Sequence, residues 1–281
     1  MLCRAHALFV LTTAFFCAPL SAQWIHYPTA GVPKTSTGKP NLAAPAPRTR
    51  DGKTGLKPDL SGMWMNSVSL PCPAMLKADD GSCAERNGIA PEEVNIGKSL
   101  PDGLPYTPWA LDEMQRRKAN LFGDDPHVRC LPPSFPRAWG LPHITKLIQI
   151  PGEIAILDEY NASYRQIFTD GRPLPVDPQP SWQGYSTAHW EGDALVVRTE
   201  GFRDDIWLDS AGSPLTSVGK MTERIRRPNF GTLTIDLTIE DAKAYTKPWT
   251  IHLKQAFVLD TELIDEICLE NEQSIRHLPL K

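Results

Sequence analysis

The chain has 281 residues, enough to bury a full hydrophobic core, and this length predicts one or two domains. The formal net charge is −4 at pH 7, and lysine and arginine do not gather into clusters along the sequence. This mild acidity argues against nucleic acid and anionic membrane surfaces as partners.

The first 22 residues have the pattern of a secretory signal peptide. Arg4 supplies the positive charge, an apolar run extends from Ala7 to Pro19, and Leu20-Ser21-Ala22 offers a small-residue cleavage site. The run is too short to cross roughly 30 Å of hydrocarbon as a helix. Lipidation at Cys17 is an alternative, but a large side chain precedes it where a small one is expected. The sequence therefore predicts a periplasmic or extracellular protein with no membrane insertion after cleavage.

Cleavage leaves Cys72, Cys83, Cys130 and Cys268 in the mature protein. Four cysteines in an oxidising compartment predict two disulfides, with three possible pairings. Cys72 and Cys83 enclose a short loop and are the natural local pair, which leaves Cys130 for Cys268. The alternative is a zinc site, but the spacing of the cysteines and histidines matches no ligand pattern. We expect no metal and no other cofactor.

The N-terminal half contains few regular elements. Residues 23–58 are rich in Pro, Thr, Gly and Lys and poor in large apolar residues, which predicts an extended arm. A first strand is predicted at Leu60–Asn66, followed by a long irregular insertion at Cys72–Pro108. Pro108–Asn120 is the one predicted helix, with Pro108 near its first turn. Cys130–Pro142 is rich in proline and is predicted to be a loop.

Alternating apolar and polar residues after His143 indicate antiparallel strands joined by short turns. The predicted strands are Thr145–Ile150, Glu153–Tyr160, Ser163–Thr169, Ser186–Trp190, Ala194–Thr199, Met221–Arg226, Leu233–Ile239, Trp249–Phe257 and Leu263–Glu270. Many antiparallel strands with one helix predict a mainly β fold, either a barrel or a sandwich. In the absence of a repeat or a clear linker, residues 59–281 are predicted to form one domain.

One short motif favours a single antiparallel β-barrel. Ser61-Gly62-Met63-Trp64, at the start of the first predicted strand, resembles the Gly-x-Trp opening of lipocalin and related calycin barrels. The resemblance implies that Trp64 closes one end of the barrel and that an arginine from near the last strand lies across it. Arg276 is the candidate. The alternative is a glycine that begins a strand beside a core tryptophan.

Longer runs carry a second resemblance. They are Tyr164–Pro173, His189–Thr199, Thr222–Pro228 and Ala244–Trp249. These runs resemble a family of uncharacterised secreted bacterial proteins with no established activity. The resemblance implies secretion and a β-barrel-like fold, and it transfers no catalytic residue.

Three residues are candidates for acid/base catalysis. Glu159 lies on a mostly apolar strand, where desolvation of the carboxylate would raise its pKa into a useful range. His189 is a natural proton-transfer residue, and the alternation around Glu223 places it with Met221 on the inner face. Each has a structural alternative: a strand end reached by water for Glu159, a structural histidine for His189, and a solvated strand edge for Glu223.

The candidate ligand-binding residues are of two kinds. Arg165 and Arg172 flank Asp170 and could clamp a carboxylate or phosphate of a ligand. In the structural alternative, Asp170 caps its turn and the arginines pair with acids on the strand faces. Aromatic side chains could bind sugars or planar ligands, or could fill the core. These aromatic candidates are Trp182, Tyr185, Trp190, Trp207, Tyr245 and Trp249.

Three functions remain open on the sequence alone. The first is an exported barrel that binds a small apolar or aromatic molecule. The second is a cofactor-independent lyase, isomerase or hydrolase, which requires at least two of the three acid/base candidates to converge in one pocket. The third is a cell-envelope interaction module, which requires a large exposed apolar patch. Nucleophile-elbow, zinc-protease, phosphate-loop and dinucleotide motifs do not occur in the sequence.

Overall fold

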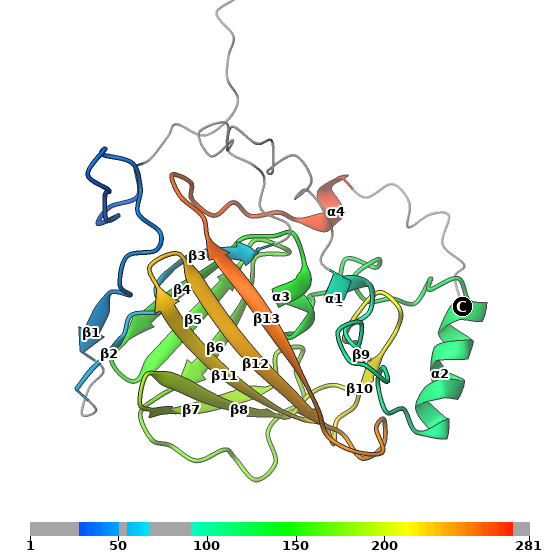
Figure 1. Ribbon diagram of the computed structural model, residues 1–281. Coiled ribbons are helices and arrows are strands. Elements are labelled where there is room, and N and C mark those ends of the chain that lie inside the picture. The colour runs from blue at the N-terminus through cyan, green and yellow to red at the C-terminus, as the bar shows by residue number, and fades with distance from the viewer. Residues whose placement is uncertain (1–27, 51–54, 68–90, 272–281) are drawn as a thin grey trace, which may run out of the picture.

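The computed structural model describes residues 28–50, 55–67 and 91–271 (Figure 1). Its centre is a closed barrel of nine strands in the order β11-β12-β13-β3-β4-β5-β6-β7-β8. The barrel strands are β3 (Gly62–Asn66), β4 (Thr145–Ile150), β5 (Glu153–Asp158), β6 (Ser163–Phe168), β7 (Tyr185–Glu191), β8 (Ala194–Glu200), β11 (Lys220–Asn229), β12 (Thr232–Glu240) and β13 (Trp249–Phe257). The predicted mainly β fold with a single barrel is confirmed.

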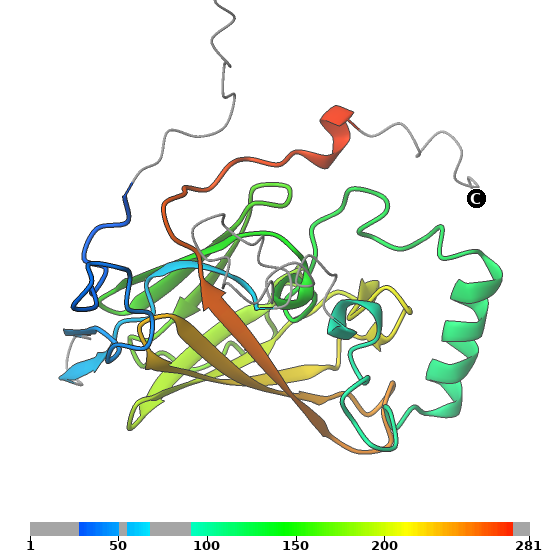
Figure 2. The same cartoon turned by 45° about the horizontal axis from the view of Figure 1, so that its top comes forward.

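The remaining elements are short, apart from one helix. They are the strands β1 (Arg48–Arg50), β2 (Leu56–Pro58), β9 (Ile206–Trp207) and β10 (Pro214–Leu215), and the helices α1 (Pro91–Val94), α2 (Pro108–Ala119), α3 (Arg137–Gly140) and α4 (Cys268–Asn271). The helix predicted from Pro108 is therefore confirmed as α2. Thr107 caps it by accepting a hydrogen bond from the Ala110 N–H at 3.3 Å. Both views place α2 beside the barrel, on the side away from β1 and β2 (Figure 1, Figure 2).

Only one of the neighbouring barrel strand pairs is parallel. β6 and β7 pair in parallel through Ile167 with Ser186 and Phe168 with Thr187, whereas the other barrel pairs are antiparallel. β6 begins at Ser163, so its first half has no partner strand on this side among the described residues. The parallel junction therefore leaves the barrel wall incomplete beside β6.

The barrel interior is filled by side chains. The four inward residues of β12, Leu233, Ile235, Leu237 and Ile239, have no exposed surface, and the same alternation continues on β11 and β13. Burying each such side chain contributes about 1.5–3 kcal/mol. The period-two pattern read from the sequence is thus the packing pattern of the core.

Trp64 packs in the core of the barrel against an arginine. The Trp64 indole is fully buried and donates a hydrogen bond to the Leu60 carbonyl at 3.0 Å. The arginine across it is Arg227 of β11, whose guanidinium lies 4.9 Å from the centroid of the Trp64 ring. Gly62 has φ +142°, and a Cβ there would collide with the Phe257 ring. An arginine therefore lies over Trp64, but it comes from β11 and not from near the last strand; Arg276, the candidate named from the resemblance, lies outside the described residues.

The short helix α3 fills the interior near β3 and β13. The Trp139 carbonyl accepts hydrogen bonds from Asn66 Nδ2 at 3.1 Å and from Gln255 Nε2 at 2.9 Å. All four residues of α3 are buried. The loop predicted at Cys130–Pro142 is therefore wrong in this part, because burial of Trp139 stabilises a helical turn that its composition does not favour.

The predicted last strand at Leu263–Glu270 is also wrong. β13 already pairs with β3, so the barrel is closed and offers no edge to another strand. This segment forms an isolated bridge from Glu266 to Tyr160 and then the helix α4. A disulfide joins Cys130 to Cys268, with the two Cα atoms 5.3 Å apart, so this predicted pairing is confirmed. Cys72, Cys83 and the signal peptide lie outside the described residues.

The arm predicted at residues 23–58 contains some regular secondary structure. Its described part contains the β1–β2 hairpin and attaches to the turn after β11. The Phe230 and Gly231 N–H groups donate to the carbonyls of Ala44 and Leu42, each at 2.8 Å.

Within the described part of the chain, no helix has the length and apolar character needed to cross a membrane.

The disulfide gives a first prediction. Cys130 and Cys268 are separated by 138 residues in the sequence, so their bond restricts a long loop in the unfolded chain. We expect the double substitution Cys130→Ser/Cys268→Ser to lower the free energy of unfolding by about 2–5 kcal/mol. Urea unfolding under non-reducing conditions measures the difference. Equal midpoints for the two proteins would show that this bond does not stabilise the fold.

Candidate functional site

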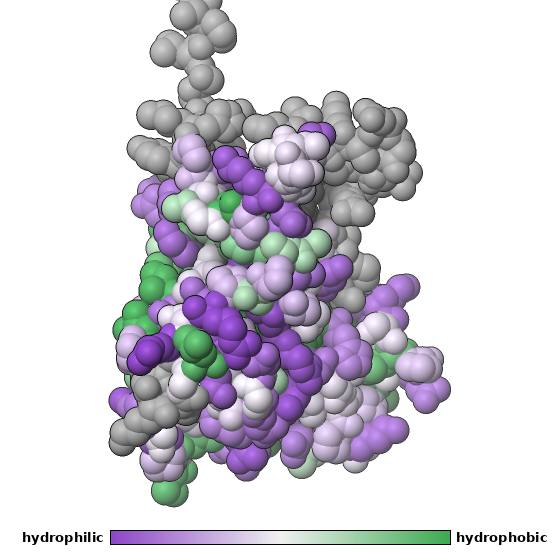
Figure 3. Space-filling view, turned by 60° about the vertical axis from the view of Figure 1, so that its left-hand side comes forward, coloured by the Kyte–Doolittle hydropathy of each residue, from purple (hydrophilic) through white to green (hydrophobic). Residues whose placement is uncertain are grey.

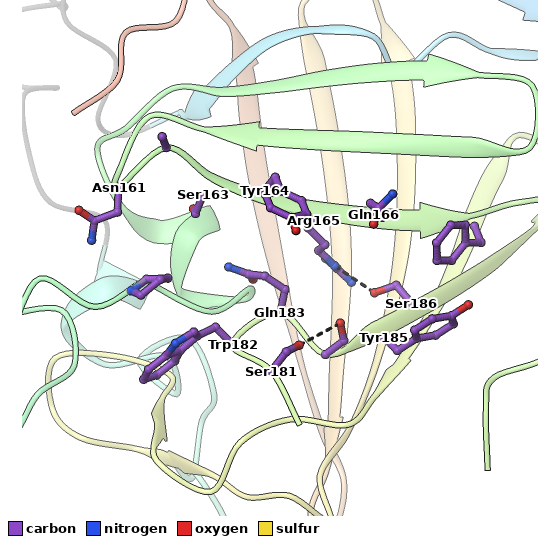
Figure 4. Close-up of a pocket in the computed structure, with 14 residues that line it drawn as sticks. Asn161, Ser163, Tyr164, Arg165, Gln166, Ser181, Trp182, Gln183, Tyr185 and Ser186 are labelled. Atoms are coloured by element: carbon purple, nitrogen blue, oxygen red, sulfur yellow. Dashed lines mark hydrogen bonds between the residues drawn. The ribbon is translucent and has the colours of Figure 1, made fainter. Parts of the chain in front are cut away.

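A cleft of about 480 Å³ opens beside β6, where the parallel junction leaves the wall incomplete (Figure 4). Residues 161–166 and Phe168 form one side, and residues 181–186 form the other. The lining side chains include Pro132, Asn161, Ser163, Tyr164, Gln166, Phe168, Ser181, Trp182, Gln183, Tyr185 and Ser186. The volume is within the range of about 300–1,000 Å³ that small-molecule sites occupy.

Arginines hold the aromatic rings at both ends of the cleft. At one end the rings of Phe168 and Tyr185 lie 5.3 Å apart, and the Arg172 guanidinium stacks 3.9 Å from the centroid of Phe168. At the other end the Arg203 guanidinium lies 4.6 Å from the centroid of Trp182. These stacked pairs restrict the rings before any ligand arrives, which lowers the entropic cost of binding.

Gln183 connects the cleft to the segment before α3. Its Oε1 accepts a hydrogen bond from the Phe135 N–H at 3.1 Å, and its Nε2 donates to the Pro133 carbonyl at 2.8 Å. The loop that carries Trp182 and Gln183 therefore takes the place of a strand opposite the first half of β6. The position of the cleft wall depends on the packing of α3 in the barrel.

An ion pair between Arg165 and Glu223 lies beneath the cleft, inside the barrel. The Arg165 Nη2 and Glu223 Oε2 atoms are 2.5 Å apart, and neither side chain has exposed surface. Arg165 also donates to Ser186 Oγ at 3.1 Å and to Thr199 Oγ1 at 2.8 Å, and the Trp139 indole donates to Glu223 at 2.9 Å. Arg165 therefore lines the cleft, but its guanidinium is bound to Glu223 and not directed at a ligand.

The other two acid/base candidates lie in different surroundings. The Glu159 carboxylate accepts hydrogen bonds from the Ile144 N–H at 2.8 Å and the Ile264 N–H at 3.4 Å, and burial raises its pKa. The His189 side chain is 55 % exposed on the outer face of β7 and lies 3.1 Å from Glu191. Among the hydrogen bonds of the described residues, none joins two of Glu159, His189 and Glu223. These three side chains are also absent from the lining of the cleft.

Asp170 and Arg172 form the turn after β6. The Asp170 carboxylate accepts a hydrogen bond from the Arg172 N–H at 3.1 Å and pairs with its guanidinium at 2.6 Å. Asp170 therefore caps its own turn, which is the structural alternative predicted from the sequence. Arg172 contributes to the cleft through its contact with Phe168, and its Nη1 lies 3.4 Å from the Tyr185 hydroxyl.

Of the proposed aromatic binding residues, Tyr185 and Trp182 line the cleft and the others lie elsewhere. Trp207 packs against Arg117 at 4.6 Å, and the buried Tyr245 donates from its hydroxyl to the Pro214 carbonyl at 2.8 Å. The centroid of the Trp190 ring lies 6.0 Å from Lys57. Trp249 is buried in the core.

Sequence reasoning missed Tyr164, Phe168 and Gln183 as lining residues. Tyr164 and Phe168 occupy outward positions of β6, each two residues from the outward Gln166, and this alternation could have identified them as surface aromatics. No local signal marks Gln183, because its role depends on the loop replacing a strand.

Several buried acids outside the cleft have raised pKa values. Burial raises the pKa of Asp158, on the inner face of β5, to about 8. Burial also raises the pKa of Glu93 to about 7, although Glu93 pairs with Arg137 at 2.9 Å. Arg137 binds Asp125 as well, at 2.6 Å, so this network ties α1 to α3. No group of three or more potential metal ligands occurs among the residues that the structure describes.

The chain was compared with protein-family models, curated proteins and solved structures, and no match was found. The resemblances of the sequence to calycin barrels and to secreted bacterial proteins therefore remain predictions.

The buried ion pair gives a second prediction. Glu223→Gln leaves the Arg165 charge buried without a counter-ion, and we expect it to lower the free energy of unfolding by about 3–5 kcal/mol. The double variant Arg165→Met/Glu223→Leu removes both charges and should lose less. Glu191→Gln, which removes the charge of the exposed pair with Arg224, is the control and should change stability much less than Glu223→Gln, because solvent screens this pair. A Glu223→Gln protein as stable as this control would contradict the assigned ion pair.

Asp158 gives a third prediction, on pH. Its pKa is about 8 when folded and 3.8 in an unperturbed side chain, so the folded state binds more protons between these values. Its contribution to stability is therefore complete below about pH 4 and is lost as the pH rises through about 8. Asp158→Asn keeps a neutral polar group there at every pH.

The measurement is urea unfolding of both proteins at acidic, neutral and alkaline pH. We expect the original protein to lose stability relative to Asp158→Asn as the pH rises. The difference between the two isolates Asp158, because the remaining titrating groups are common to both. A difference independent of pH would contradict the raised pKa.

Proposed function

We propose that the protein is an exported β-barrel protein that binds a small molecule with a flat apolar or aromatic face in the cleft between β6 and β7. The observation that carries the proposal is the gap in the barrel wall, lined by the rings of Tyr164, Phe168, Trp182 and Tyr185. Aromatic rings bury a large contact area at low conformational cost, and they dominate the lining of small-molecule sites.

The proposed site lies in the wall of the barrel and not along its axis. The interior is occupied by core side chains such as Leu233 and Ile235 and by the Arg165–Glu223 pair, so a ligand would bind at the surface. Other surface clefts occur among the described residues, one of about 510 Å³, but the cleft beside β6 has the most aromatic rings in its lining. The predicted signal peptide and the Cys130–Cys268 disulfide are consistent with action in an oxidising compartment outside the cytoplasm.

The two alternative functions have less support. An acid/base enzyme needs neighbouring proton-transfer groups, whereas Glu159, His189 and Glu223 each bind other partners. An envelope interaction module needs a large continuous apolar surface. On the face shown in Figure 3, hydrophobic residues form separate groups among hydrophilic ones.

The fourth prediction tests the proposed site. Native mass spectrometry of the mature protein, incubated with a mixture of aromatic, terpenoid and sugar metabolites, should detect a retained molecule of unchanged mass. Trp182→Ala and Tyr185→Ala should each weaken its binding at least about tenfold, because each removes a stacking surface worth about 1.4 kcal/mol or more.

Trp109→Ala is the matched control. Trp109 is 38 % exposed on α2 and contacts Lys243, away from the cleft. Its loss should leave binding unchanged, and thermal unfolding of all three variants checks that they are folded. A ligand retained equally by the two cleft variants would place the binding site elsewhere. A metabolite that is consumed, with a new product formed, would favour an enzyme.

A further inference from the structure

We infer that the ligand of the cleft is a neutral carbohydrate, a short oligosaccharide. This inference rests on the proposed function and names the chemical class of the molecule at the same site. It follows from three properties of the lining: compensated charge, polar atoms suited to hydroxyl groups, and rings at both ends.

The cleft offers no uncompensated charge. Arg165 is the one formally charged side chain among its described lining residues, and Glu223 neutralises it from 2.5 Å away. The arginines behind the rings are also paired, Arg172 with Asp170 at 2.6 Å and Arg203 with Asp205 at 2.8 Å. An anionic or cationic ligand would lose hydration here without gaining a free counter-charge. The site therefore favours a neutral molecule.

The polar lining matches hydroxyl groups. Asn161, Gln183 and Ser186 line the cleft but are hydrogen-bonded to other groups of the protein. The polar atoms that remain for a ligand are the Tyr164 hydroxyl, Ser181 Oγ and Gln166 Oε1. Amides and hydroxyls both donate and accept hydrogen bonds, and so do the hydroxyl groups of a sugar. Within the described residues, the buried Ser163 Oγ has no hydrogen-bond partner. A purely apolar ligand would cover the Tyr164 hydroxyl, Ser181 Oγ and Gln166 Oε1 and deprive them of the hydrogen bonds that water supplies, which is unfavourable.

The rings match the apolar faces of sugar rings. A pyranose carries C–H groups on its faces and hydroxyl groups around its edge, so it can stack on an aromatic ring while its edge binds amides and hydroxyls. In the close-up, Trp182 and Tyr185 stand toward opposite ends, with Ser181 and Gln183 between them (Figure 4). This order of ring, polar groups and ring suits a ligand with more than one sugar unit.

The test measures binding to the mature protein by isothermal titration calorimetry and by saturation-transfer NMR. The probes are neutral glucose, xylose and N-acetylglucosamine oligomers, an acidic galacturonic acid oligomer, and 2-naphthol as a planar aromatic. We expect at least one neutral oligomer to bind at least tenfold more tightly than the acidic one. Its affinity should change little between low and high salt, because no ion pair forms.

Variants tie the binding to the cleft. Trp182→Ala and Tyr185→Ala should each weaken oligosaccharide binding at least tenfold, Tyr185→Phe should keep most of it because the ring remains, and the control Trp109→Ala should keep all of it. Binding of 2-naphthol that depends on Trp182 and Tyr185, without binding of any sugar, would overturn this inference and leave the proposed function in place. If no probe or metabolite bound in a manner sensitive to these two residues, both would be overturned.

Discussion

A closed ring with an odd number of strands cannot be antiparallel throughout, because strand direction must alternate and still agree when the ring closes. This barrel has nine strands, so at least one junction must be parallel, and that junction lies between β6 and β7. The two strands overlap by only two residue pairs there, and a loop takes the place of a strand beside the first half of β6. The strand number therefore requires a parallel junction, and the short overlap of β6 and β7 at that junction leaves room for the cleft.

The filled interior explains why the wall, and not the lumen, holds the candidate site. Core side chains from β11, β12 and β13 occupy the axis, and the Arg165–Glu223 pair satisfies its own hydrogen-bonding groups with Ser186, Thr199 and Trp139. A buried pair of this kind is costly to break, because removing one partner leaves the other charge unpaired. It therefore supports the floor of the cleft without offering charge to a ligand.

The cleft and the packing of α3 are joined by a short chain of contacts. Gln183 in the cleft loop binds the backbone at Pro133 and Phe135, the Phe135 and Trp139 rings lie 4.9 Å apart, and Trp139 donates to Glu223. Side chains that are distant in the sequence thus hold one another in position. This arrangement holds the aromatic rings of the cleft on a rigid scaffold, which favours binding with little rearrangement.

The sequence by itself indicated the nine barrel strands and the long helix, because alternation and capping are local signals, and it favoured Cys130–Cys268 among three possible pairings. It identified Arg165, Trp182 and Tyr185 as candidates, but not their roles. Only the tertiary structure decided that Arg165 binds Glu223, that Arg227 covers Trp64, and that residues 263–270 form no barrel strand. Alternation reports which face of a strand is buried, but not which strand lies beside it, and barrel closure depends on every strand at once.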